Sequence, residues 1–314
     1  MAAGLGPRAG KPMTAADVVI MLGAAATGGL MNAMAGGGTI ITFPALVFLG
    51  QPAITANATS TVALLPGMAA SMAGYGKEVA THKEWLKTLL LPSVIGGGIG
   101  SVLLLRTPEK VFANLAPLLV LFATLLFIWQ GFLARRRQPP SFTGAAASGA
   151  PQTIAAASGD SQTIAAAASG QPAAAHLPPA AAGDGAPSLR LSRTRWAWAI
   201  LFQFGVSIYG GYFGAAIGIL MLAVLGFLGL TNIFAMNGLK NFFGLCINGV
   251  AAAYFILRGA VVWPVALLMM AGSIAGGYGG ARLAQVIGKE KARAAVVIIG
   301  FVVTALLFWQ RFRS

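Results

Sequence analysis

One unusual kind of apolar segment occurs twice in this 314-residue chain, about 180 residues apart. In the first copy, an apolar run is interrupted by residues 36–39 and then by Pro44. In the second copy, a comparable run is interrupted by residues 209–214 and by Gly218. Paired, glycine-interrupted hydrophobic segments at corresponding places of two halves indicate the binding site of a transporter. This duplication therefore restricts both the fold and the function of the chain.

The composition is that of a membrane protein. Hydrophobic residues make up 57% of the chain and charged residues only 9%, whereas soluble proteins carry about 25% charged residues. Several apolar runs reach the roughly 20 residues that a helix needs to cross the hydrocarbon core. They lack the alternation of apolar and polar residues that is typical of membrane strands. The sequence therefore predicts an all-α, polytopic helical protein whose partner is the lipid bilayer.

Apolar stretches divide the chain into two halves of similar layout. The first half, residues 14–137, has stretches at about 17–36, 38–50, 53–75, 86–105 and 111–133. The second half, residues 193–314, has stretches at about 196–213, 214–230, 232–257, 260–284 and 293–310. The segment between them, residues 138–192, is rich in Ala, Ser, Gly, Pro and Gln and has few large apolar side chains to bury. We expect two transmembrane repeats joined by a low-complexity, disordered cytoplasmic linker.

The two halves match each other in register. Ile54 corresponds to Ile233, 179 positions later, and Ser93 corresponds to Ser273, 180 positions later. Lys and Arg favour cytoplasmic loops, and they are concentrated beside the linker and in one basic loop of each half. Counting stretches from these loops gives the two copies opposite orientations. The sequence thus predicts inverted repeats with Gly-broken helical hairpins, and leaves open whether the early segments of each half span the membrane or re-enter it.

The formal net charge of +14 is not taken as a sign of nucleic-acid binding. Most of the 21 Lys and Arg residues lie between apolar runs, where they orient membrane helices. The single cysteine, Cys246, lies in an apolar segment, and His82 and His176 lie in expected loops. We therefore expect no nucleic-acid partner, no metal site and no cofactor, and leave open whether the protein is a homo-oligomer.

The two interruptions are candidate binding tips. Glycine clusters in membrane helices usually serve close packing, and we interpret residues 96–100 and 276–280 in this way. The clusters at 36–38 and 210–214 differ because each falls between two short apolar legs, where a helix must break. Non-helical backbone at membrane depth has to be buried or line a cavity, and free N–H groups at the start of a half-helix suit an anion. The expected contacts are Gly36, Gly37, Gly38, Thr39, Tyr209, Gly210, Gly211, Tyr212 and Gly214.

Polar residues near both interruptions complete this candidate site. Lys240 lies about eight residues into its apolar stretch, roughly 12 Å deep at 1.5 Å per residue. A cation at that depth marks a functional site, unless its long stem reaches back to the interface. All seven acidic residues lie in expected loops or at segment ends, so buried carboxylates for cation transport are missing. Hydroxyls, amides and one lysine suit an oxyanion, and the residues concerned are Asn32, Asn57, Thr59, Ser60, Asn237, Lys240 and Asn241.

These motifs resemble the TauE/SafE family of membrane proteins, often called sulfite exporters. The motifs are residues 35–39 with Pro44, 56–60, 208–214 and 236–241. The resemblance covers almost the whole chain except the linker and the extreme N-terminus. It implies a multi-pass protein that exports or exchanges small sulfur-containing anions, such as sulfite or organosulfonates, across the bacterial inner membrane. Ala215 and Ala216 depart from the family pattern, which often has further glycine there, and the linker is unusually long.

The resulting hypothesis is a transporter for a small oxyanion that works by alternating access, as other carriers with inverted repeats do. An intramembrane enzyme is disfavoured because the sequence has no His-Glu-x-x-His, Gly-x-Ser-x-Gly or buried acidic pair. Three alternatives stay open: an anion channel, a transporter for another small organic anion, and a scaffold subunit that transports nothing.

Overall fold

The structure is a computed structural model, and it describes residues 13–34, 36–73, 76–136, 193–230, 232–287 and short helical pieces between 297 and 309. The described residues are helical except for short turns, and there is no strand among them. Apart from Arg136, they belong to one compact unit, formed by the chain up to Arg135 and from Arg190 onwards. The predicted linker, 138–192, lies outside the described residues. The prediction of an all-α fold is confirmed.

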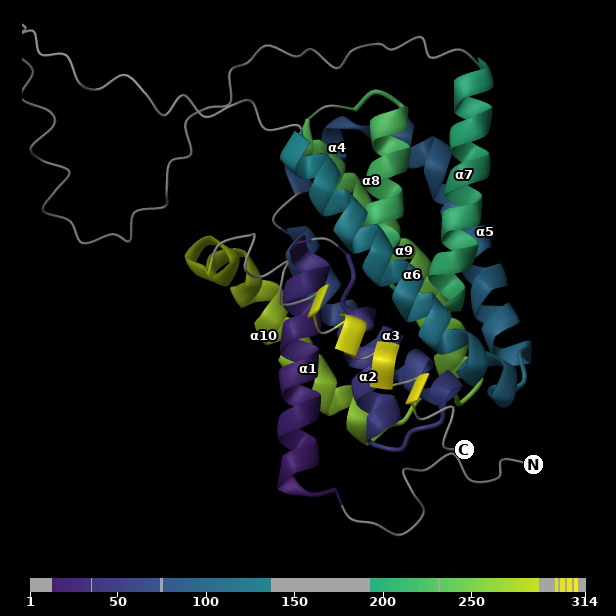
Figure 1. Cartoon of the computed structure of the whole chain (residues 1–314). Coiled ribbons are helices and arrows are strands. Elements are labelled where there is room, and N and C mark those ends of the chain that lie inside the picture. Colours follow the sequence, from purple (N-terminus) through teal and green to yellow (C-terminus); the bar gives the residue numbers. More distant parts are fainter. Residues whose placement is uncertain are drawn as a thin grey trace, which may run out of the picture. The chain divides into compact units, whose positions relative to one another are not determined.

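The helices are numbered in chain order (Figure 1). The first half contains α1 (Ala15–Met34), α2 (Thr39–Phe48), α3 (Ala53–Ala73), α4 (Gly76–Thr81), α5 (Lys83–Arg106) and α6 (Glu109–Arg136). The second half contains α7 (Arg193–Tyr212), α8 (Ile217–Phe227), α9 (Ile233–Leu257) and α10 (Trp263–Ile287). Four of the described helices, α1, α5, α6 and α9, contain segments long and apolar enough to cross a membrane. A multi-pass arrangement is therefore confirmed.

Each interruption joins a long helix to a helix of half its length. The 20 residues of α1 precede the 10 residues of α2, and the 20 residues of α7 precede the 11 residues of α8. At 1.5 Å per residue, the short helices are only about 15 Å long, which is half of the roughly 30 Å hydrocarbon core. The two legs around each break are thus unequal, whereas the sequence suggested two short ones.

The second break lies further along the chain than predicted. Tyr209 and the two glycines after it are helical, and α7 ends at Tyr212. Gly211 lies inside the helix and packs directly against α5, where a Cβ on it would overlap the carbonyl oxygen of Gly97. The chain turns instead at Gly214, whose φ of +78° is accessible at low cost only to glycine. The prediction of a broken helix from Tyr209 onwards is wrong.

Pro44 does not interrupt the chain either, because it lies inside α2. Proline removes one backbone hydrogen bond, here the bond to the carbonyl group of Ile40. Membrane helices tolerate this loss when neighbouring helices cover the freed group. Both Pro44 and Ile40 are buried, which fits this explanation.

The other glycine clusters bring helices into close contact, as predicted. A Cβ on Gly96 of α5 would lie 2.6 Å from the Cβ of Ser207 in α7. A Cβ on Gly276 of α10 would overlap the carbonyl oxygen of Ala26 in α1. The interpretation as packing glycines is confirmed for these described residues.

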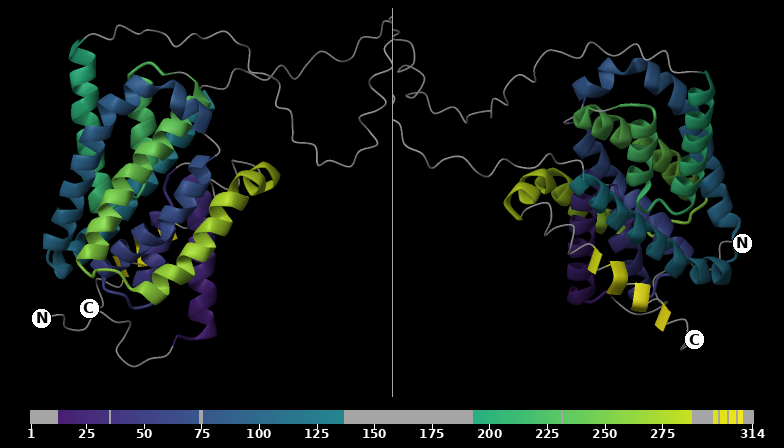
Figure 2. Two further views of the ribbon diagram at one scale, coloured as in Figure 1. Left: turned by 180° about the vertical axis from the view of Figure 1, so that it is seen from behind. Right: turned by 45° about the horizontal axis from the view of Figure 1, so that its top comes forward.

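Helices of the first half pack mainly against helices of the second half. Helix α1 packs chiefly on α10, and its counterpart α7 packs chiefly on α5. Likewise α3 packs on α10, α9 packs on α5, and α3 and α9 contact each other. In Figure 1, α1 rises from the lower end of the unit whereas α7 descends from the upper end, and Figure 2 shows α5 running beside α7. Each half therefore supplies a helix that packs against the broken pair of the other half.

Candidate functional site

The two breaks approach each other across the halves. Gly36 has a φ of +77°, and a Cβ on it would lie 2.7 Å from the Cα of Gly218, in the first turn of α8. Gly214 has a φ of +78°, and a Cβ on it would lie 3.8 Å from the Oγ1 of Thr39, the first residue of α2. Each break thus lies beside the N-terminal end of the half-helix that belongs to the other half.

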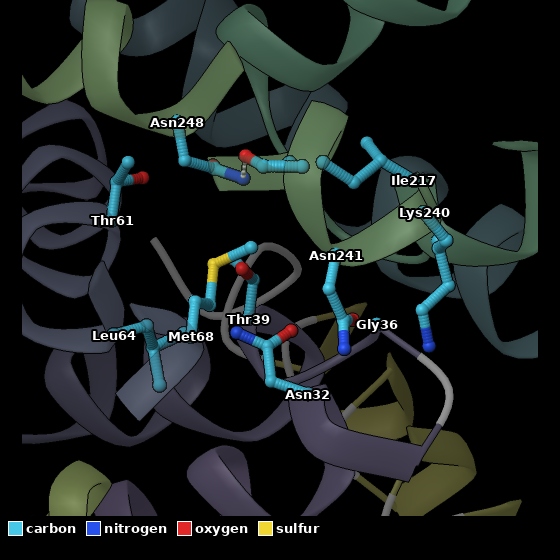
Figure 3. Close-up of a pocket in the computed structure, with 13 residues that line it drawn as sticks. Asn32, Gly36, Thr39, Thr61, Leu64, Met68, Ile217, Lys240, Asn241 and Asn248 are labelled. Atoms are coloured by element: carbon cyan, nitrogen blue, oxygen red, sulfur yellow. Dashed lines mark hydrogen bonds between the residues drawn. The ribbon is translucent and has the colours of Figure 1, made fainter. Parts of the chain in front are cut away.

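A narrow pocket lies where these ends meet (Figure 3). Its free space is about 10 Å³, which is close to the space of a single water molecule. It is lined by Asn32, Gly36, Thr39, Thr61, Leu64, Met68, Gly214, Ile217, Gly218, Lys240, Asn241, Gly244 and Asn248. None of these lining residues is acidic.

Helix α9 brings two buried nitrogen donors to the pocket. Lys240 is only 2% exposed, and its Nζ donates a hydrogen bond of 3.2 Å to the Oδ1 of Asn237. Asn241 is 5% exposed, and its Nδ2 has no hydrogen-bond partner among the described residues. A buried donor left in this state costs about 1–3 kcal/mol. A ligand that accepts hydrogen bonds and carries negative charge would satisfy both groups.

Both half-helices point their N-terminal ends at the pocket. Thr39 begins α2, and Ile217 and Gly218 begin α8, and all three line the pocket. Neither helix has a side-chain cap on its N-cap residue. At the α2 end, the N–H of Gly38 donates to the Oδ1 of Asn32 at 3.4 Å. The partial positive charge of two helix N-termini adds to the charge of the lysine, so the electrostatics of the pocket favour an anion.

Of the residues predicted from the sequence, six come together in the wall of the pocket. They are Asn32, Gly36, Thr39, Gly214, Lys240 and Asn241. The others do not line it, namely Gly37, Gly38, Asn57, Thr59, Ser60, Tyr209, Gly210, Gly211, Tyr212 and Asn237.

Two hydroxyl groups of this second set connect helices to each other. The Oγ1 of Thr59 accepts a hydrogen bond of 3.1 Å from the backbone N–H of Val262, just before α10. The Oγ of Ser60 forms a hydrogen bond of 2.5 Å with the Oγ1 of Thr42 in α2. Both bonds are buried, so these hydroxyl groups hold α3 against its neighbours.

Asn57, Tyr209 and Tyr212 of this set make contacts between helices. The Nδ2 of Asn57 donates to the carbonyl oxygen of Tyr212 at 3.1 Å. The hydroxyl group of Tyr212 shares a hydrogen bond of 3.3 Å with the Oγ1 of Thr107. The ring of Tyr209 packs edge-on against Phe122 of α6, with the ring centroids 5.8 Å apart, and its buried hydroxyl group has no hydrogen-bond partner within the described ranges.

Seven lining residues were not among the predicted contacts. They are Thr61, Leu64, Met68, Ile217, Gly218, Gly244 and Asn248. Helical spacing carries the signal that could have found most of them, because residues three or four positions apart share a helix face. Thr61, Leu64 and Met68 form such a stripe on α3, and Gly244 and Asn248 continue the stripe that begins at Asn241 on α9. A search for polar groups alone overlooks the apolar members.

Comparison with known proteins identifies the family. The model of the family described as sulfite exporter TauE/SafE matches residues 20–307. The chain belongs to the TauE/SafE family. A "Probable membrane transporter protein" of Haemophilus influenzae is 25% identical over 285 residues, which cover 90% of each chain. The "Probable membrane transporter protein YfcA" of Escherichia coli is 22% identical over 289 residues, which cover 90% of this chain and 86% of YfcA. No solved structure matches the chain.

Membership of the TauE/SafE family makes this protein a membrane transporter. The family resemblance inferred from the motifs is confirmed, and so is the prediction that the chain is not an enzyme. The structure gives Ala216 an unusual backbone conformation. Ala216 is the N-cap of α8 and has a φ of +60°, a left-handed conformation that costs a residue with a side chain about 1–2 kcal/mol. This TauE/SafE protein thus keeps a turn suited to glycine although the residue is alanine.

Proposed function

We propose that this TauE/SafE transporter moves a small sulfur-containing oxyanion, such as sulfite or an organosulfonate, out across the bacterial inner membrane by alternating access. The observation that supports this most strongly is the meeting of two half-helix N-termini with the buried Lys240 in a pocket without acidic residues. Three sources of positive potential at one place, inside a low-dielectric environment, suit a compact anion.

The oxygen atoms of such an anion would take the hydrogen bonds that the pocket leaves open. The Nδ2 of Asn241 has no partner in the part of the chain that the structure describes, and Lys240 can turn from Asn237 to the ligand with little loss. Hydrogen bonds between charged groups are worth about 1.5–3 kcal/mol each. When the pocket has no anion, Asn237 accepts the hydrogen bond of Lys240. Asn32 and Thr39 complete the polar side of the proposed site.

The proposed mechanism rests on two inverted repeats, residues 14–137 and 193–314, joined by a cytoplasmic linker at 138–192. It is supported by the nearly equal φ values of Gly36 and Gly214 and by the exchanged pairs α1–α10 and α7–α5. The opposite courses of α1 and α7 in Figure 1 agree with it. A pocket between two such repeats opens to one side or the other when one repeat rocks against its partner. Its small free space corresponds to a closed stage of that cycle.

The test is a flux assay with the purified full-length protein in proteoliposomes. Sulfite, sulfate, thiosulfate, sulfoacetate and acetate are compared as substrates, with sodium and potassium as cation controls. We expect sulfur oxyanions to move, and we expect external sulfite to accelerate the exit of internal sulfite, because a carrier exchanges its substrate. Flux without exchange would identify an anion channel, and movement of cations alone would contradict the oxyanion site.

Lys240→Met provides the matching test of the site, because methionine keeps most of the volume of the lysine stem but removes its charge. We expect sulfite affinity to fall by about 10–100-fold, which corresponds to the loss of one charged hydrogen bond. Lys87→Met is the control, since Lys87 is exposed on α5 and does not line the pocket. Equal sulfite affinity of the Lys240→Met variant and the wild type would give Lys240 a purely structural role.

A further inference from the structure

The pocket has two chemically different sides. Lys240 and Asn241 of α9 supply nitrogen donors, and Leu64 and Met68 of α3 supply apolar groups across from them (Figure 3). The thioether of Met68 reaches into the middle of the pocket, above Asn32 in the same view. Sulfate has oxygen atoms on all sides and sulfite has three oxygen atoms on one side of its sulfur, but neither carries an apolar group, so the apolar side requires a separate explanation.

The two sides come from different helices. Leu64 and Met68 belong to α3, whereas Gly244 and Asn248 belong to α9, and all four line the pocket. The side chains are bulky and apolar on α3 but small or polar on α9. The pocket is therefore asymmetric in its chemistry.

Gly244 provides the space for the tip of Met68. A Cβ on Gly244 would lie 3.1 Å from the Cε of Met68, and among the described residues no other atom outside its own stretch of helix lies within 4 Å of that Cβ. Such a distance is tighter than most real contacts, so the methionine would have to shift by a few tenths of an ångström. Methionine is unbranched and has three rotatable bonds, so it changes its conformation more readily than leucine. Met68 is therefore the movable part of the apolar side.

We infer that Met68 and Gly244 form an adjustable filter that limits the size of the apolar substituent on the transported oxyanion. This inference rests on the proposed function, because it places the oxygen atoms of the anion at Lys240 and Asn241. The substituent of a sulfonate bound in this way points to α3. Met68 fills that space in the closed pocket and turns aside for a short alkyl group. A longer alkyl group exceeds the space that Met68 can release.

The test uses a series of competitors against labelled sulfite in the proteoliposome exchange assay: methanesulfonate, ethanesulfonate and propanesulfonate. Met68→Ala should improve the affinity for longer competitors, by about fourfold for each added methylene that gains a place on the apolar side. Gly244→Ala should act in the opposite direction, because it pushes Met68 into the pocket. We expect propanesulfonate to lose at least about tenfold in that variant, since a tight pocket discriminates strongly against an extra methylene. Sulfite itself should change by less than about threefold in both variants.

Met269→Ala is the matched control, since Met269 is fully buried in α10 and does not line the pocket. It should leave the ratio of propanesulfonate to sulfite affinity unchanged. An unchanged ratio in both the Met68→Ala and Gly244→Ala variants, with sulfite exchange intact, would overturn the size filter and leave the proposed function standing. Absence of sulfite and sulfonate exchange in the wild type would overturn the proposed function and this inference with it. If Met68→Ala does not fold, Gly244→Ala decides the question alone, because its new methyl group would press on the Cε of Met68 and on no other described residue outside its own stretch of helix.

Discussion

Alanine at Gly36 should destabilise the protein more than alanine at Gly214, although the two glycines have almost the same backbone conformation. Their φ values are +77° and +78°. A residue with a Cβ pays about 1–2 kcal/mol for this left-handed conformation at either place. If backbone conformation were the only requirement, the two variants would therefore lose equal stability.

The surroundings of the two glycines differ. A Cβ on Gly36 would lie 2.7 Å from the Cα and 3.0 Å from the N of Gly218, which are backbone atoms of α8. A Cβ on Gly214 would have its nearest neighbours at 3.2 Å, the carbonyl oxygen of Gly210, and at 3.3 Å, the Oδ1 of Asn248. Only the first contact requires a helix to move, and overpacking of this kind adds about 1–3 kcal/mol. We expect a total loss of about 2–5 kcal/mol for Gly36→Ala and about 1–2 kcal/mol for Gly214→Ala.

The measurement is the midpoint of thermal unfolding of the detergent-solubilised variants, followed by the loss of the monodisperse peak in size-exclusion chromatography. Gly23→Ala is the control, because Gly23 is an exposed residue of α1 and a Cβ on it would have no atom within 4 Å. Alanine is favoured over glycine in a helix by about 0.5–1 kcal/mol, so this control should equal or exceed the wild type. A midpoint for Gly36→Ala that matches Gly23→Ala, or lies above that of Gly214→Ala, would refute the close approach of the first break to α8.

Two further variants test how the helices are held together. Thr59→Val removes the acceptor for the N–H of Val262 and should lower stability by about 1–3 kcal/mol in the same unfolding assay. Thr59→Ser keeps the hydroxyl group and should retain most of the stability. Equal midpoints for the two variants would contradict the role of this hydroxyl group. Gly276→Ala places a methyl group on the carbonyl oxygen of Ala26, so we expect little folded protein in a comparison of purification yields. At Gly249 no described residue outside the local helix lies within 4 Å of an added Cβ, so Gly249→Ala should give the yield of the wild type. An equal yield for Gly276→Ala would argue against the close contact of α1 with α10.

The positions of the long helices followed from the sequence, because the bilayer requires continuous apolar runs. The run expected at about 232–257 is α9 (Ile233–Leu257), and the run expected at about 86–105 lies within α5 (Lys83–Arg106). Lys240 was likewise recognisable as a candidate, since a lysine is costly at that depth in a membrane. Hydropathy and charge belong to each residue by itself, so the segments that enter the membrane can be predicted without knowing which helices pack beside them.

The roles of individual glycines did not follow from the sequence. Gly211 and Gly214 stand three residues apart in the same motif, yet the first packs against Gly97 and the second turns the chain. Whether a glycine allows a close approach or an unusual φ depends on which helix passes beside it. That neighbour is contributed by a distant part of the chain, and local sequence carries no record of it.

The residues of the pocket show the same difference between what the sequence determines and what the tertiary structure determines. The sequence by itself determined a helical membrane protein with two glycine-interrupted segments and one lysine well inside an apolar stretch. Tertiary structure decided that Thr59 and Ser60 bind other helices, while Met68 and Gly244 face the pocket. The physical reason is that the side chains of a helix point in all directions around its axis, and only the packing of α3 against α2, α9 and α10 selects which of them meet the site.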